Sequence, residues 1–167
     1  MHTRISIITT GGTIDGADSD KKTSRAQSDA VEWLSAQPSI QIKHIPLMNK
    51  DSRLITDKDR QNIVQTALQD ENNLIIITHG TFTICQTGRA LKKHLKSLEK
   101  TILLVGAWVP FGEPNSDAEQ QMSFALSILK SPRIGVFIAM DNHLWDPDTT
   151  EKKEIAPGVY RLETIAS

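Results

Sequence analysis

Short apolar runs rich in isoleucine recur along the chain, and the segments between them carry apolar residues at helical spacing. The five runs are Ile5–Ile8, Ile40–Ile45, Leu74–Ile77, Ile102–Val105 and Ile134–Ile138. Most of these runs are continuous rather than alternating with polar residues, which is typical of parallel strands covered on both faces. Strand and helix alternate, so we expect an α/β fold: a three-layer, doubly wound, mostly parallel sheet with helices on both faces.

Helices are indicated in three of the gaps between the apolar runs. Their apolar residues are Ile63, Val64, Ala67 and Leu68, then Ile84, Gly88, Leu91, Leu95 and Leu98, then Ala118, Met122, Ala125 and Leu129. Thr56 with Asp59, and Ser116 with Glu119, resemble capping boxes that would begin the first and third of these helices. Cys85 lies on the apolar side of the second helix, so we expect it in the core.

Composition limits the kinds of protein and of site that are possible. The 167 residues are enough for one domain with a real core, and we expect residues 1–167 to form a single domain. The formal net charge of −1 argues against a nucleic-acid-binding surface. No stretch is long enough to span a membrane and no signal-peptide pattern is present, so we expect a cytoplasmic protein. The lone cysteine and five scattered histidines lack metal-site spacing, so we expect neither a metal nor a cofactor.

Two glycine–threonine turns follow the first and third apolar runs: Gly11-Gly12-Thr13 and His79-Gly80-Thr81. In an open parallel sheet, ligands bind beyond the carboxyl ends of the strands, so the two threonine hydroxyls should lie together if these strands are neighbours. Such a pair is typical of a nucleophile and its partner, because a threonine hydroxyl needs a neighbouring base. A tight turn without chemistry stays an alternative. A phosphate cradle is disfavoured, since neither G-x-G-x-x-G nor a P-loop lysine is present.

Two further features lie beside these turns. His79 could act as a general base or pack beneath its turn, and we favour packing. The segment Gly16–Gln27 holds almost nothing apolar and directly follows the first turn. It is either a solvated loop or a mobile lid over the site, and its position favours the lid.

Several segments resemble the signatures of bacterial-type L-asparaginases. Thr10-Gly11-Gly12-Thr13-Ile14 resembles the first signature and Thr78-His79-Gly80-Thr81 the second. Further similar segments are Asp51-Ser52 with Thr56–Asp59, Val105–Pro110, Ser116–Ala118, and Trp145-Asp146 with Lys152. The resemblance extends from about Ile5 to Lys152 and is to a short form of this family, similar to its N-terminal domain.

The resemblance implies an amidohydrolase that converts L-asparagine or a related small amide to the acid and ammonia through a threonine acyl-enzyme. Thr13 would attack the amide carbon, and Thr81 with Lys152 would assist proton transfer. Ser52 would bind the substrate's α-carboxylate, and backbone N–H groups near Thr81 and Ala107 would stabilise the oxyanion. The other expected substrate contacts are Gly12, Gly80 and Phe82.

The chain departs from the family pattern in three ways. Phe82 replaces an aspartate that, in the family, binds the substrate's α-ammonium group and the catalytic lysine; phenylalanine is expected to do neither. No tyrosine lies between Ile14 and Leu47, where the family places one in its lid, and the chain's one tyrosine is Tyr160. We also expect the family's smaller C-terminal domain to be absent. The similarity around Lys152 is loose, so Lys153 is the second choice for the catalytic lysine.

Three hypotheses follow. The chain is an amidohydrolase of the asparaginase type, an amidohydrolase for a substrate without a free α-ammonium group, or a non-catalytic small-molecule-binding protein on the same scaffold. Phe82 and the missing lid tyrosine favour the last two, whereas Thr13, Thr81 and Lys152 favour the first two. We expect a homodimer or higher homo-oligomer, because sheet edges and site walls would otherwise face water.

Overall fold

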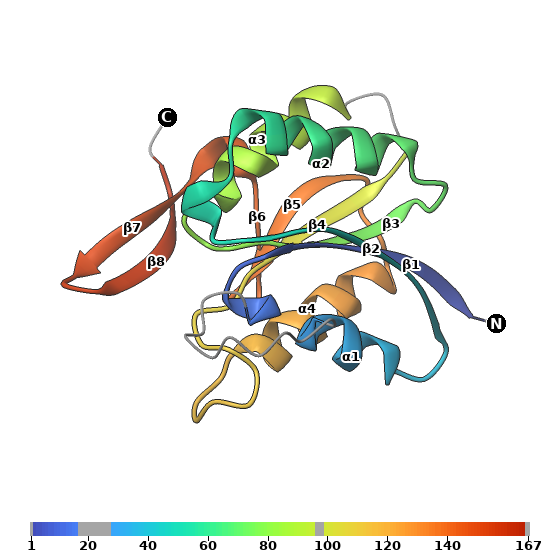
Figure 1. Cartoon of the computed structure of the whole chain (residues 1–167), viewed down its shortest axis with the longest axis horizontal. Coiled ribbons are helices and arrows are strands. Elements are labelled where there is room, and N and C mark those ends of the chain that lie inside the picture. Colours follow the sequence, from blue (N-terminus) through green and yellow to red (C-terminus); the bar gives the residue numbers. More distant parts are fainter. Residues whose placement is uncertain (1, 17–27, 96–98, 166–167) are drawn as a thin grey trace.

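The computed structural model describes residues 2–16, 28–95 and 99–165 and contains a mostly parallel six-stranded sheet (Figure 1). The strands lie in the order β2-β1-β3-β4-β5-β6, and only β6 runs antiparallel to its neighbour. The strands are β1 (Thr3–Gly11), β2 (Ile40–Lys50), β3 (Leu74–Thr78), β4 (Thr101–Val105), β5 (Gly135–Met140) and β6 (His143–Trp145). The five predicted strands are confirmed, and each predicted apolar run overlaps one of them.

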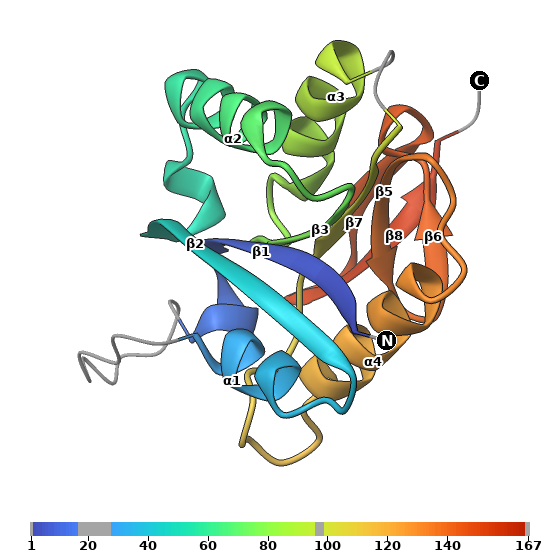
Figure 2. The same ribbon diagram turned by 90° about the vertical axis from the view of Figure 1, so that its right-hand side faces the viewer.

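Helices cover both faces of the sheet, which confirms the predicted three-layer fold (Figure 2). One face carries α2 (Asp57–Gln69) and α3 (Ile84–His94), and the other carries α1 (Asp29–Ser35) and α4 (Ala118–Leu129). The figure shows these pairs above and below the sheet. Within the described ranges, no helix combines the length and apolar character needed to cross a membrane.

Alternation along the strands divides the core into two halves. In β3, Ile76 packs with α1 and α4, whereas Ile75 and Ile77 pack with α2 and α3; all three side chains are fully buried. Successive side chains of a strand point to opposite faces, so a central strand needs apolar residues at every position. The edge strand β2 is different, because its residues are only partly buried or exposed. Cys85 is buried in the core, as expected.

One of the two predicted capping boxes is present. Thr56 caps α2 with the reciprocal Asp59 bonds of a capping box. The prediction for Ser116 with Glu119 is wrong, because Asp117 is the N-cap residue of α4 and makes no side-chain capping bond there. Its carboxylate is used elsewhere, accepting hydrogen bonds from the backbone N–H groups of Trp108 and Val109.

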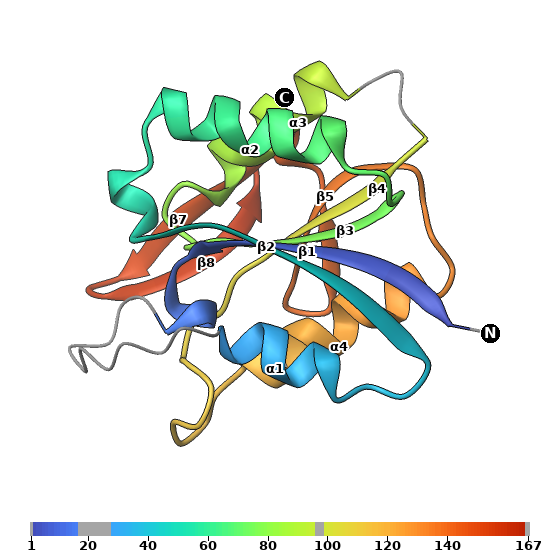
Figure 3. The ribbon, with the colours of Figure 1, turned by 45° about the vertical axis from the view of Figure 1, so that its right-hand side comes forward.

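The sequence pattern did not predict the antiparallel hairpin of β7 (Thr150–Ala156) and β8 (Val159–Thr164). It projects from the body of the molecule beyond the carboxyl ends of the parallel strands (Figures 1 and 3). Most of its residues are exposed or partly exposed, and Leu162 is its one buried large apolar residue. A hairpin with so little buried surface carries no apolar run that would reveal it. The predicted lid, Gly16–Gln27, lies outside the described residues except for Gly16.

Candidate active site

The two glycine–threonine turns lie side by side at a topological switch point. The strand order 2-1-3-4-5 places β1 next to β3, and Thr9 is in register with Thr78 at the ends of these strands. The chain leaves β1 and β3 for helices on opposite faces of the sheet, which opens a crevice at their carboxyl ends. The sequence prediction that Thr13 and Thr81 meet at this edge is therefore supported by the topology.

Glycine is required in the first turn because the two turns touch through their backbones. Gly12 has φ 80°, a left-handed conformation that glycine adopts without strain. A Cβ atom on Gly12 would lie 2.4 Å from the backbone nitrogen of Gly80. Gly80 in turn packs on Ser52, since a Cβ atom there would lie 2.7 Å from the Ser52 hydroxyl oxygen. These glycines bring Thr13 and Thr81 close together rather than lining the pocket themselves.

A carboxylate, Asp15, supports the first turn from beneath. It accepts hydrogen bonds from the backbone N–H of Gly11 at 3.0 Å, from the hydroxyl of Thr78 at 2.5 Å, and from the hydroxyl of Ser28, the N-cap residue of α1. Asp15 therefore connects β1, β3 and α1. Desolvation raises the pKa of its carboxyl from 3.8 to about 6, although these hydrogen bonds oppose the shift.

A neutral imidazole, His79, supports the second turn. The ring is fully buried, and its Nδ1 lies 2.7 Å from the carbonyl oxygen of Gly80, which makes Nδ1 the donor. Nε2 then accepts from the Thr87 hydroxyl at 2.8 Å. Burial lowers the pKa of His79 from 6.5 to about 4. The ring packs under its turn, as favoured from the sequence.

A cavity of about 340 Å³ opens at this edge of the sheet. It is lined by Thr13, Thr81, Phe82, Ala107, Trp108, Lys152, Gly158, Val159 and Tyr160. The turns after β1, β3 and β4 supply one side of the cavity, and the β7–β8 hairpin supplies the other. Thr13, Thr81, Phe82, Ala107 and Lys152 were expected from the sequence. Gly12, Gly80 and Ser52, which were also expected, are not among the lining residues.

Lys152 reaches the second turn from the hairpin. Its Nζ donates a hydrogen bond to the Thr81 hydroxyl at 2.8 Å and lies 3.3 Å from the centroid of the Phe82 ring. The expectation that phenylalanine does not bind the lysine is therefore wrong, because an aromatic face attracts an ammonium group. Lys153 points to the other face of the hairpin, where it pairs with Glu163 at 3.4 Å. The structure thus brings Lys152, not Lys153, to the site.

Aromatic rings surround the ammonium group of Lys152. Besides Phe82, the centroids of Tyr160 and Trp108 lie 4.3 and 5.4 Å from Nζ. Tyr160 meets Phe82 edge to face, with the ring centroids 5.5 Å apart. The Trp108 indole N–H donates to Asp141 at 3.1 Å, and Gln121 bridges the carboxylates of Asp141 and Asp117. This network fixes the orientation of the indole.

A charged pair lies on the outer side of Phe82. Arg53 has its guanidinium carbon 4.8 Å from the ring centroid and donates two hydrogen bonds of 3.0 Å from Nε to Asp51. These bonds are the main reason that the pKa of Asp51 lies below its ordinary value. Between these residues is Ser52, whose side-chain oxygen is buried with no hydrogen-bond partner among the described residues. An unpartnered buried hydroxyl is costly unless a ligand or water completes it.

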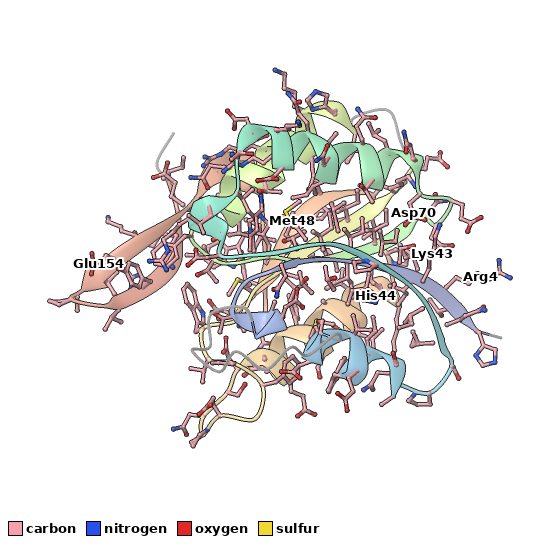
Figure 4. The ribbon with its side chains drawn as sticks, in the orientation of Figure 1. Arg4, Lys43, His44, Met48, Asp70 and Glu154 are labelled. Carbon is pink, nitrogen blue, oxygen red and sulfur yellow. The ribbon has the colours of Figure 1, made fainter. Side chains whose placement is uncertain are left out.

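A second polar cluster lies at the amino ends of the parallel strands, away from the pocket. Figure 4 shows Arg4, Lys43 and Asp70 far from Glu154 of the hairpin. Lys43 pairs with Asp70 at 3.1 Å, and the buried Lys100 donates to the carbonyl oxygen of Asp70 at 2.6 Å. These bonds fix the loop between α2 and β3 and lie at the amino ends of the strands. They belong to the framework rather than to the pocket.

Sequence reasoning missed four lining residues: Trp108, Gly158, Val159 and Tyr160. Trp108 lay inside a segment quoted for the family resemblance but had no role assigned. The other three come from the hairpin, where Pro157-Gly158 marks the turn and Gly158 has φ 72°. That dipeptide was the one local signal for a turn in this part of the chain.

Comparison with known proteins agrees with this geometry. The family model for the N-terminal domain of asparaginase matches residues 4–156. The chain belongs to the asparaginase family. It is 29% identical over 142 residues to the L-asparaginase of Thermococcus kodakarensis, a match that covers 81% of this chain and 43% of that protein. It is also 30% identical over 151 residues to a component of the glutamyl-tRNA(Gln) amidotransferase of the same organism, covering 85% of this chain and 34% of that component.

Solved structures lead to the same family. The thermostable L-asparaginase from Thermococcus kodakarensis superposes with a TM-score of 0.78 and 25% identity, over 95% of this chain and 51% of that one. The chain therefore spans about half the length of that structure and less of the curated relatives.

Proposed function

We propose that this asparaginase-family chain is an amidohydrolase that releases ammonia from a small amide through an acyl-enzyme on Thr13. The observation that carries this proposal is the 2.8 Å hydrogen bond from Lys152 to Thr81 inside a pocket that Thr13 also lines. A hydroxyl nucleophile needs a proton-transfer group nearby. The relatives named above, an L-asparaginase and an amidotransferase component, support amide chemistry in this family.

In this mechanism the Thr13 oxygen attacks the amide carbon and a tetrahedral intermediate forms. Backbone N–H groups at Thr81 and Ala107, on the wall that both residues line, stabilise the oxyanion. The proton that Thr13 gives up reaches the amide nitrogen by way of the Thr81 hydroxyl, to which Lys152 donates a hydrogen bond, and the nitrogen leaves as ammonia. Water then attacks the ester, which frees the acid and restores the threonine. Thr81 and Lys152 move protons in both half-reactions.

The family places a tyrosine in its lid, and this chain has none there. We propose that Tyr160 supplies the phenol instead. It lines the same pocket as Thr13 and its ring lies 4.3 Å from the ammonium of Lys152. A phenol can both donate and accept a hydrogen bond, so it can pass a proton between neighbouring groups. In this proposal the hairpin supplies both Lys152 and Tyr160, and the sheet edge supplies both threonines.

An ammonia-release assay over a panel of small amides tests the proposal. Release from at least one amide, lost on substitution of Thr13, supports an amidohydrolase. Ligand binding by calorimetry without any ammonia release would instead support the alternative, a non-catalytic small-molecule-binding protein on this scaffold.

We further propose that the chain forms a homodimer or higher homo-oligomer, and that it is cytoplasmic. The long edge strand β2 is exposed or partly buried, and exposed strand edges are usually covered in native assemblies. Ile155 and Val159 of the hairpin are also large exposed apolar residues. Light scattering at assay concentration is expected to give at least twice the monomer mass; a fully active monomer would refute the assembly.

A further inference from the structure

We infer that the substrate of this pocket is a small amide that carries a carboxylate but no ammonium group. The inference rests on the proposed function and adds the chemical class of the substrate. Its basis is the environment of Phe82, which lines the pocket and contacts two cationic side chains.

The pocket has no acidic lining residue within the part of the chain that the structure describes. The lining residues that carry polar side-chain groups are Thr13, Thr81, Tyr160, Lys152 and Trp108, and the Trp108 indole N–H donates to Asp141. An ammonium group that leaves water for such a wall loses hydration and gains no carboxylate in return. Hydroxyl oxygens can accept a hydrogen bond from it, but they do not neutralise its charge.

Aromatic faces attract cations in general, but these rings do not stabilise a substrate ammonium in addition to that of Lys152. Phe82 already has the Lys152 ammonium at 3.3 Å and the Arg53 guanidinium at 4.8 Å from its centroid. Tyr160 has the same ammonium at 4.3 Å. A substrate ammonium beside these rings would approach cations of like charge in a partly desolvated site, where repulsion is strong.

The same surroundings favour a carboxylate. Lys152 brings a positive charge into the pocket beside Phe82, and Arg53, which is paired with Asp51, lies against the same ring. The buried hydroxyl of Ser52 can donate a hydrogen bond, and it has no partner among the described residues. Asp51 is paired with Arg53, and Asp141 accepts a hydrogen bond from the Trp108 indole; neither carboxylate lines the pocket. The Lys152 ammonium attracts an anionic substituent and repels a cationic one, and no carboxylate among the described lining residues reverses this preference.

Two matched substrates isolate this effect. Succinamate is L-asparagine without its amino group, so the pair differs only at the substituent in question. The kcat/KM for succinamate is expected to exceed that for L-asparagine at least tenfold. A lower value for succinamate, or an equal one, overturns the inference while leaving an amidohydrolase in place.

Two matched variants locate the effect at Phe82. Phe82→Asp introduces a carboxylate and Phe82→Asn introduces a neutral side chain of nearly the same size. For each variant we take the ratio of kcat/KM for L-asparagine to kcat/KM for succinamate. This ratio is expected to be at least tenfold higher in Phe82→Asp than in Phe82→Asn. Equal ratios in two folded variants would mean that residue 82 does not contact the substrate's amino group, and would overturn the inference.

A binding measurement separates this inference from the proposed function. Calorimetry with succinate and L-aspartate, the two acid products, needs no turnover. Tighter binding of succinate by at least tenfold, with no ammonia released from any amide of the panel, would sustain the ligand class and reject the amidohydrolase. Tighter or equal binding of L-aspartate, or no binding of either acid, would reject the ligand class.

Discussion

The two glycine–threonine turns are alike in sequence, but a buried acid supports the first and a buried base supports the second. Each follows an isoleucine-rich strand and each presents a threonine to the same pocket. The first rests on Asp15, an acid whose charged form is penalised by burial. The second rests on His79, a base whose charged form is penalised in the same way. Burial pushes both groups toward neutrality, and it therefore moves their pKa values in opposite directions.

The consequence for stability follows from the signs of the shifts. The pKa of Asp15 is raised to about 6, so the folded state holds this proton more tightly, and stability falls as pH rises from about 4 to about 6. The pKa of His79 is lowered to about 4, so stability falls as pH drops from about 6.5 to about 4. Each shift is worth up to about 3 kcal/mol. The two effects oppose each other over one pH range.

The largest expected effect separates the two threonines by role. Thr13→Ala is expected to lower kcat/KM for ammonia release at least ~10³-fold, because it removes the hydroxyl that forms the acyl-enzyme. Thr81→Ala is expected to cost less, roughly 10²-fold, since it removes only a proton-transfer partner. Thr13→Ser retains the hydroxyl and serves as the control. If Thr13→Ala kept the parent rate while Thr81→Ala lost it, the roles of the two turns would be reversed.

Gly12→Ala tests the contact between the turns. A Cβ atom there would lie 2.4 Å from the backbone of Gly80, whereas at Gly112, which has φ 78°, it would meet nothing within 4 Å. The two glycines share a positive φ, so Gly112→Ala measures the cost of a Cβ atom at positive φ without a clash, about 1–2 kcal/mol. Gly12→Ala is expected to lower the free energy of unfolding by at least about 2 kcal/mol more. Equal losses in urea denaturation would show that the turns do not press on each other.

Removing either supporting group is expected to reveal the pH dependence of the other. In Asp15→Asn the contribution of Asp15, which falls with rising pH, disappears, so the free energy of unfolding should rise between pH 4.5 and 6.5 by about 2 kcal/mol relative to the parent. In His79→Gln it should fall over the same range by a similar amount. Urea unfolding at the two pH values measures both slopes. Parallel slopes in the parent and the two variants would contradict the assignment of opposing titrations.

The sequence predicted the sheet-edge wall of the pocket far better than the hairpin wall. The wall at the strand ends was predictable because an apolar run followed by a glycine turn is a local signal, and the parallel topology then brings such turns together. The hairpin wall depends on contacts between residues far apart in sequence, such as Lys152 with Thr81, and its exposed strands carry no apolar pattern. The sequence therefore did not predict that Tyr160 lines the pocket. The contact between the Phe82 ring and the Lys152 ammonium was not predicted, because composition does not show which side chains lie close together in the fold.

The smallest of these effects concerns the hairpin wall. Tyr160→Phe keeps the ring that packs edge to face on Phe82 and removes only the hydroxyl. If this phenol assists proton transfer to or from Thr13, kcat should fall about tenfold, at the lower end of acid–base contributions, with KM within about twofold of the parent. Tyr160→Leu is the companion variant, because it also removes the ring beside Lys152 and should raise KM as well. An unchanged kcat in the phenylalanine variant, together with a raised KM in the leucine variant, would restrict Tyr160 to packing. Proton transfer would then rest on Thr81 and Lys152, and the hairpin would contribute a single catalytic group rather than two.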